Sequence, residues 1–241
     1  MLRLITLGFL VVFGCTKLHA NEVHFTESAI LIDGSIETLW DKAAWYPLPY
    51  LMAGSKPKKD DFSGRFRLLW DQNYLYLHAE IIDDILSDIS HNPLKDYWQD
   101  DCLEVFIDSD ASGGIHQFNH SAFAYHIALD NQVVDLDENK QARLYNQHVL
   151  SRWQRNTQQP EKINWEVAVK LFPDNYSDMQ PLPAQQLKVN QNIGFMLAYC
   201  DNDGNQQREH FMGSVAITPV NGDSNRGWID ADVFTRMILI K

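Results

Sequence analysis

Residues 97–108, YWQDDCLEVFID, join an acidic turn to a short strand whose two faces differ, and this stretch decides the fold. Side chains alternate along a strand, so Leu103, Val105 and Ile107 point to one side. The opposite side carries a mixed set: Cys102, Glu104, Phe106 and Asp108. A strand with one apolar face belongs to a sheet that packs that face on a partner and leaves the other face for a partner or solvent.

The same alternation recurs along the chain, at 64–70, 74–81, 122–129, 163–172, 193–204 and 236–241. Residues 143–156 fit one long strand or two. Residues 28–45 predict a short apolar strand, a turn at Asp33-Gly34 and a helical turn, and the proline-bearing residues 47–61 predict an irregular loop. Short strands, frequent turn signals and almost no helical periodicity predict an all-β protein. We expect a single antiparallel β-sandwich, immunoglobulin- or jelly-roll-like, with a short N-terminal helix.

The first twenty residues have the pattern of a signal peptide. Arg3 precedes an apolar run, ITLGFLVVFG, that is too short to span a bilayer. Leu18-His19-Ala20 resembles a signal-peptidase site, whereas residues 12–15 resemble a lipobox that would place a lipid anchor on Cys15. Both alternatives predict an exported bacterial protein, either periplasmic, secreted or held at the outer membrane as a lipoprotein. The predicted mature domain is 21–241.

The predicted mature domain is acidic. Of the 20 Lys and Arg residues, Arg3 and Lys17 fall in the leader, so 18 basic residues face 32 acidic ones, a net charge of −14. This charge argues against nucleic acid as a partner, because binding to phosphates needs a basic surface. It suits a soluble protein that meets a neutral or cationic ligand, or a divalent metal ion. Cys102 and Cys200 both lie on the non-core side of predicted strands, and their spacing leaves a disulfide between them open.

The tryptophans divide into two groups. Trp40, Trp70 and Trp165 lie on apolar faces and are predicted to belong to the core. Trp98 and Trp228 lie in polar loops that contain Asp and Gly. An indole at a strand entrance can stack on the C–H face of a sugar ring while a carboxylate nearby accepts its hydroxyls. The alternative is an ordinary core strand behind a solvated acidic turn.

With these segments in order, the chain resembles a family 9 carbohydrate-binding module, within the wider group of sandwich domains that includes the DOMON sugar- and haem-binding modules. The resemblance rests on seven pieces: IDGSIETLW (32–40), RLLWDQNYLYL (67–77), residues 98–108, WEVAVKLF (165–172), IGFMLAYCDNDG (193–204), GWIDADVF (227–234) and RMILIK (236–241). They cover nearly the whole mature domain. The resemblance implies a β-sandwich that binds sugars, commonly chain ends, between two tryptophans and carries structural calcium.

The resemblance also implies which residues bind the sugar: Trp98, Glu104, Asn225 and Trp228. Two positions depart from the family pattern. Cys102 stands where the family has a serine, and the family's arginine falls on Tyr125 by ungapped counting. Strand alternation instead turns Tyr125 to the core and aims His126 at the ligand, and Arg226 is a further candidate for the missing arginine contact.

Metal binding and catalysis are two further hypotheses. The turns Asp83-Asp84 and Asp201-Asn202-Asp203 are rich in oxygen ligands and are either calcium sites or solvated turns. A glycoside hydrolase needs two carboxylates across the scissile bond. Asp101 and Glu104 are three residues apart on a strand, so they point to opposite faces. We therefore expect a non-catalytic module that assists polysaccharide breakdown by binding.

A b-type haem is the alternative from a different class. It would need an axial pair such as Met and His. His78, His126 and Met196 point away from the apolar faces, but no fixed spacing marks two of them as a pair. The sequence therefore favours a sugar over haem as the ligand.

Overall fold

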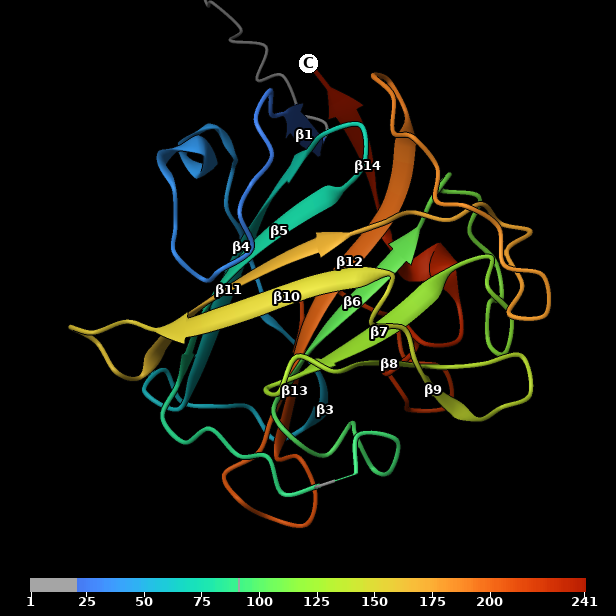
Figure 1. The fold of residues 1–241 in the computed structure, drawn as a ribbon. Coiled ribbons are helices and arrows are strands. Elements are labelled where there is room, and N and C mark those ends of the chain that lie inside the picture. Colours follow the sequence, from blue (N-terminus) through green and yellow to red (C-terminus); the bar gives the residue numbers. More distant parts are fainter. Residues whose placement is uncertain (1–20, 91) are drawn as a thin grey trace, which may run out of the picture.

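The computed structural model describes residues 21–90 and 92–241, and in it two layers of strands pack face to face (Figure 1). One layer contains β2 (Tyr46–Pro47), β4 (Phe62–Trp70), β5 (Leu75–Asp83), β10 (Val149–Arg155) and β11 (Lys162–Val169). The other contains β3 (Tyr50–Gly54), β6 (Cys102–Asp108), β7 (Phe123–Ala128), β8 (Val133–Leu136), β9 (Ala142–Leu144), β12 (Asn192–Asp201), β13 (His210–Gly213) and β14 (Thr235–Ile240).

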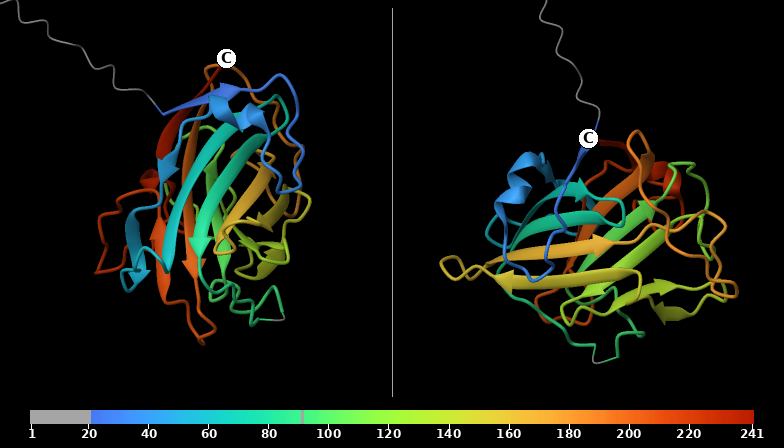
Figure 2. Two further views of the ribbon diagram at one scale, coloured as in Figure 1. Left: turned by 90° about the vertical axis from the view of Figure 1, so that its left-hand side faces the viewer. Right: turned by 45° about the horizontal axis from the view of Figure 1, so that its top comes forward.

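The first strand, β1 (Glu22–Phe25), joins the two layers. It pairs with β4 of one layer and with β14 of the other, and both pairings are parallel. The sheet is therefore continuous and folds over at β1. The start of the described chain and the C-terminus consequently lie at the same end of the molecule (Figure 2).

The core lies between the layers, as expected for a sandwich. Phe66 of β4 packs against Phe195 of β12, with ring centroids 5.4 Å apart. Phe62 stacks on Tyr199, also at 5.4 Å. Each of these pairs joins the two layers, so the predicted all-β sandwich is confirmed.

The alternation predicted for the opening stretch is also confirmed. Leu103, Val105 and Ile107 belong to the central core. Cys102 and Phe106 belong to a second buried cluster on the outer face of β6. That outer face is covered by loops rather than by solvent, because Val215, Ile217 and Trp228 of the 214–234 segment pack on the cluster.

Several local predictions need correction. The sandwich is not purely antiparallel, because β1 is parallel to both its neighbours. No strand forms within residues 28–32, whereas residues 47–61, predicted as irregular, contain β3. Among the described strands it pairs with β13 alone, and a register shift interrupts the pairing. Residues 143–156 form two strands, β9 and β10.

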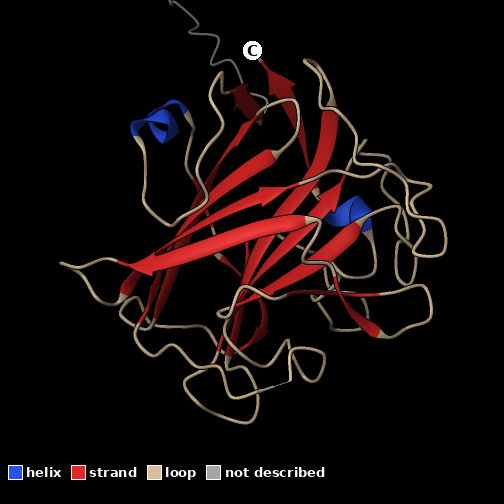
Figure 3. Ribbon diagram, viewed as in Figure 1, coloured by secondary structure: helices blue, strands red, loops and turns tan. Residues whose placement is uncertain are grey.

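The predicted N-terminal helix is a single 3-10 turn, η1 (Thr38–Lys42), and a second one, η2 (Ala231–Val233), precedes β14 (Figure 3). Trp40 of η1 is fully buried, as predicted, and its indole N–H donates to Glu166 Oε1 over 2.9 Å. The same carboxylate accepts from the backbone N–H of Gly34, whose φ of +84° suits glycine. Burial raises the pKa of Glu166 to about 7.

The predicted leader, with Cys15 and Ala20, lies outside the described residues. Within residues 21–90 and 92–241, no helix is both long and apolar enough to cross a membrane.

Candidate functional site

A cavity of about 350 Å³ lies over the outer face of β6 and β7. Glu104 of β6 and His126 of β7 are directly opposite each other in the antiparallel ladder, so their side chains project from the same face. Five of the predicted residues line this one cavity: Trp98, Glu104, His126, Asn225 and Trp228. They come from two strands and two loops that are far apart in the sequence.

Two other predicted residues are not among those that line the cavity. Tyr125 is fully buried in the core, where its hydroxyl contacts His148 Nδ1 at 2.8 Å. The conflict between ungapped counting and strand alternation is therefore resolved in favour of alternation. Arg226 contributes its backbone to the 226–230 turn, where its carbonyl accepts from the N–H groups of Ile229 and Asp230.

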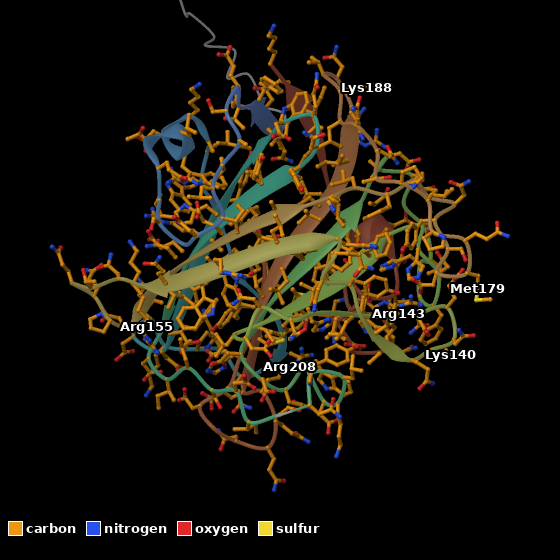
Figure 4. The ribbon with its side chains drawn as sticks, viewed as in Figure 1. Lys140, Arg143, Arg155, Met179, Lys188 and Arg208 are labelled. Carbon is orange, nitrogen blue, oxygen red and sulfur yellow. The ribbon has the colours of Figure 1, made fainter. Side chains whose placement is uncertain are left out.

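Arginine is nevertheless present at the site, as Arg208, which sequence reasoning missed. Arg208 lies in the loop between β12 and β13 and lines the cavity (Figure 4). Its Nη1 lies 3.3 Å from Glu104 Oε1 and 3.0 Å from Cys200 Sγ. Its guanidinium carbon lies 4.0 Å from the ring centroid of Phe211. Such a stack, with the carboxylate beside it, holds the guanidinium in one orientation.

Glu104 is the most heavily bonded residue of the cavity. Three groups converge on its Oε1: His126 Nε2 at 2.8 Å, the Cys200 thiol at 3.1 Å and Arg208 Nη1 at 3.3 Å. Burial alone would raise the pKa of Glu104, but the charges of His126 and Arg208 hold it below its usual value. The side chain is therefore a carboxylate at neutral pH, able to accept hydrogen bonds.

Four aromatic side chains line the same cavity as this carboxylate. Trp98 is 38% exposed, and Tyr97 touches it edge-on, with ring centroids 5.1 Å apart. Tyr97 also packs edge-on against His126, at 4.7 Å. Trp228 is half-buried and meets Phe118 edge-on at 6.3 Å. Tyr97 and Phe118 also belong to the site. The sequence did not reveal them, because a single aromatic residue in a loop carries no pattern that marks it as part of a binding site.

Cys102 and Cys200 are paired in register on β6 and β12, and both are free thiols in the structure. Both are fully buried, on the non-core side of their strands as predicted. Burial raises the pKa of both thiols, so they are protonated at neutral pH. In this state Cys200 acts as a hydrogen-bond donor to Glu104, beneath the cavity.

A second site is a cluster of buried carboxylates at the ends of β5, β6 and β12. Asp83, Asp101 and Asp201 bring one oxygen each within 4.8 Å of one another. Burial and the neighbouring Asp83 raise the pKa of Asp201 to about 8, and burial raises those of Asp83 and Asp101 as well. Asp83 Oδ1 and Asp201 Oδ2 are buried and have no hydrogen-bond partner among the described residues.

These carboxylates fit a hard divalent cation. Uncompensated buried charges are costly, and a calcium ion takes 6–8 oxygen ligands. Of the predicted ligands, Asp83 and Asp201 belong to this cluster. Asp84 and Asp203 instead gather with Asp61 in a neighbouring group within 4.8 Å. The third member of the cluster with Asp83 and Asp201 is Asp101, which the sequence suggested only as a carboxylate for hydrolysis.

The positions of Asp101 and of the histidines bear on the two alternative functions, glycoside hydrolysis and haem binding. Asp101 accepts hydrogen bonds from the N–H groups of Ser87 and Asn202, so its two oxygens are engaged away from the cavity. His78 lies on β5, in the other layer from His126, and Arg67 Nε donates to it over 3.0 Å. The two histidines therefore do not meet at one site.

Comparison with known proteins identifies the domain type. Residues 32–241 match the family described as "Carbohydrate family 9 binding domain-like". Endo-1,4-beta-xylanase A of Thermotoga maritima is 26% identical over 213 residues, 88% of this chain and 17% of the xylanase. Exoglucanase XynX of Acetivibrio thermocellus is 31% identical over 211 residues, 87% of this chain and 16% of the exoglucanase. The chain therefore spans only a small part of the length of these relatives.

Solved structures support the same fold. A family 9 carbohydrate-binding module from Caldicellulosiruptor kristjanssonii, in complex with cellotriose, superposes with a TM-score of 0.68 at 16% identity, covering 91% of this chain and 93% of that module. The complex of a family 9 module from the same organism with glucose gives a TM-score of 0.66, also at 16% identity, over 90% of this chain and 95% of that module. The family match covers residues 32–241, which is most of the chain, and it therefore decides the family assignment. The chain belongs to the family 9 carbohydrate-binding domain-like proteins.

Proposed function

We propose that this protein is a non-catalytic carbohydrate-binding module that holds a sugar ring between Trp98 and Trp228. The observation that carries the proposal is the convergence of Trp98, Trp228 and Glu104 on one cavity of a family 9 domain. Indole faces complement the C–H faces of a sugar, and a buried carboxylate accepts its hydroxyls. The complexes of related modules with cellotriose and glucose support a glycan as the ligand.

Within this proposal the residues around Glu104 have distinct roles. His126, Arg208 and Cys200 all bond to Oε1, so we assign Oε2 to a sugar hydroxyl. The three contacts fix the carboxylate in one orientation before the ligand arrives, which lowers the entropic cost of binding. Asn225 lines the cavity, and its Oδ1 has no partner among the described residues, so we assign it to a second hydroxyl.

The biological setting is also a proposal. The leader predicted in residues 1–20 would export the chain to the periplasm or outer membrane, where polysaccharide fragments arrive. The curated relatives include a xylanase and an exoglucanase much longer than the matched region. We therefore propose that this chain serves polysaccharide breakdown by retaining glycans, and that the carboxylates around Asp83, Asp101 and Asp201 hold a structural calcium ion.

Replacing Glu104 by glutamine tests the carboxylate. The substitution keeps the shape but removes the charge that Arg208 and His126 face, so charge-assisted hydrogen bonds to the ligand are lost. We expect affinity to fall by about 10- to 150-fold, from about 1.5–3 kcal/mol for a hydrogen bond to a charged group. Calorimetric titration with cello- and xylo-oligosaccharides measures the change. Undiminished affinity in Glu104→Gln would exclude this carboxylate from the site.

An assay for reducing sugar tests the absence of catalysis. The purified protein should release no reducing ends from any polysaccharide that it retains on an affinity gel. Glycosidases need a second carboxylate across the bond. Asp135, which also lines the cavity, accepts from the N–H groups of Ala124 and Leu136 through its two oxygens. Turnover that disappears in Glu104→Gln would show the protein to be a hydrolase.

A further inference from the structure

One end of the cavity differs in chemistry from the end around Glu104. Ala124 precedes His126 by two residues and projects from the same face of β7, about 7 Å along the strand. The apolar side chains that line the cavity toward this end are Phe118, Ala122, Ala124, Leu136 and Trp228, with the polar His116, Asn119 and Asp135 beside them. We call this apolar set the apolar end. A ring that reaches Glu104 with one hydroxyl would extend its opposite substituents over the apolar end.

The polar residues beside the apolar end already have partners within the protein. His116 Nε2 contacts the carbonyl of Gly227 at 2.7 Å. Asn119 donates to the carbonyl of Ile115, and its side-chain oxygen accepts from Ser121. The two oxygens of Asp135 accept from backbone N–H groups. A sugar hydroxyl that enters this end would give up its hydrogen bonds to water and would meet polar groups that already have partners. This exchange opposes binding. An apolar substituent would not have that cost.

Phe118 is held at this end by a strained backbone. Its φ is +64°, a conformation that bulky residues rarely adopt. The N–H of Asn119 donates to the carbonyl of His116 over 3.0 Å, so Phe118 occupies the third position of a tight turn, where glycine is favoured. The ring is half-buried and lines the cavity. An unfavourable backbone with a ring directed at a cavity points to a role for that ring.

A single cation stands beside this ring. Lys140, labelled in Figure 4, follows β8 and is exposed. Its ammonium lies 5.0 Å from the ring centroid of Phe118, although Lys140 is not among the residues that line the cavity. Among the described residues it has no ion pair with a carboxylate. A methyl group packed on Phe118 and a carbonyl oxygen facing Lys140 together make an acetyl group.

We infer that the apolar end of the cavity selects glycans that carry an acetyl substituent. The inference rests on the proposed sugar-binding function and adds the substituent that the site prefers. Glu104 binds the hydroxyls of the ring, and the apolar end takes the acetyl methyl. Lys140 donates a hydrogen bond to the acetyl carbonyl.

Matched polysaccharides test this preference. Acetylated xylan and acetylated glucomannan are compared with the same samples after alkaline deacetylation, by affinity electrophoresis and on a printed array. We expect the acetylated form of at least one pair to bind about fivefold or more tightly, as burial of one methyl and one new hydrogen bond would give. Binding that is equal or stronger after deacetylation in every pair, and still sensitive to Trp98→Ala, overturns the acetyl preference alone. Absence of binding to every sample overturns the proposed function and this inference together.

The variant Phe118→Gly separates recognition from structure. It removes the ring and also relieves the positive φ, so the melting temperature should stay the same or rise while the preference for acetylated glycan falls below about twofold. Ala111→Gly is the matched control, since Ala111 also has a positive φ, +55°, but does not line the cavity. It should leave binding unchanged. A lowered melting temperature, or an equal loss for both forms of the glycan, would overturn the role given to Phe118.

Discussion

Replacing Trp98 or Trp228 by alanine is expected to weaken sugar binding by roughly 5- to 150-fold, and replacing both should make it undetectable. The estimate takes about 1–3 kcal/mol per stacked ring, by analogy with bases stacked on aromatic side chains. The two losses should not add, because one indole cannot enclose a ring. Calorimetric titration with cello- and xylo-oligosaccharides gives the affinities, and calorimetric melting gives the stabilities of the same samples.

Stability distinguishes the two tryptophans and provides the control. Trp98 is 38% exposed, so Trp98→Ala should leave the melting temperature nearly unchanged. Trp228 packs on the buried cluster that contains Phe106 and Met196, so Trp228→Ala should lower it modestly. Trp153→Ala is a matched control, because Trp153 is half-buried beside Trp165 and away from the cavity. If sugar affinity survives in both Trp98→Ala and Trp228→Ala, the stacking site is wrong.

Removing calcium is expected to lower the melting temperature by about 5–10 °C. An ion present at a hundred times its dissociation constant stabilises the native state by about 2.7 kcal/mol. For a domain of this size one kcal/mol shifts the transition by about 2–4 °C. Without the ion, the buried Asp83, Asp101 and Asp201 must either carry uncompensated charge or take up protons, as their raised pKa values indicate, and both cost free energy of folding. Melting curves with excess calcium and with a chelator measure the difference.

The variant Asp201→Asn gives a sharper form of the same test. It removes one ligand, so calcium should stabilise it less than the wild type. In chelator it should be at least as stable as the wild type, because asparagine is neutral without having to take up a proton in the folded state, and Asp201 Oδ2 has no hydrogen-bond partner among the described residues to lose. Asp130→Asn, in an exposed turn, is the control and should behave as the wild type does. Identical melting curves with calcium and with chelator would remove the metal from the proposal.

The sequence determined the parts of this protein that depend on local alternation. Apolar residues at every second position predicted β4, β5, β6, β7, β11, β12 and β14 within a few residues. The same rule placed Glu104 and His126 on one face, sent Tyr125 to the core, and assigned Trp70 and Trp165 to the interior. Trp40 was assigned to the interior from the apolar face of its predicted helical turn. These predictions succeed because each strand must bury one face, and the period of two residues records which face that is.

Tertiary structure alone decided which loops meet above those faces. Arg208 reaches Glu104 because β12 pairs with β6, although 104 positions separate the two residues. Asp101 meets Asp83 and Asp201 for a similar reason, since three strand ends come together there. Phe118 reaches the cavity through a positive φ that only its turn imposes. Contacts of this kind depend on strand order and loop conformation, and neither leaves a periodic signal in the sequence.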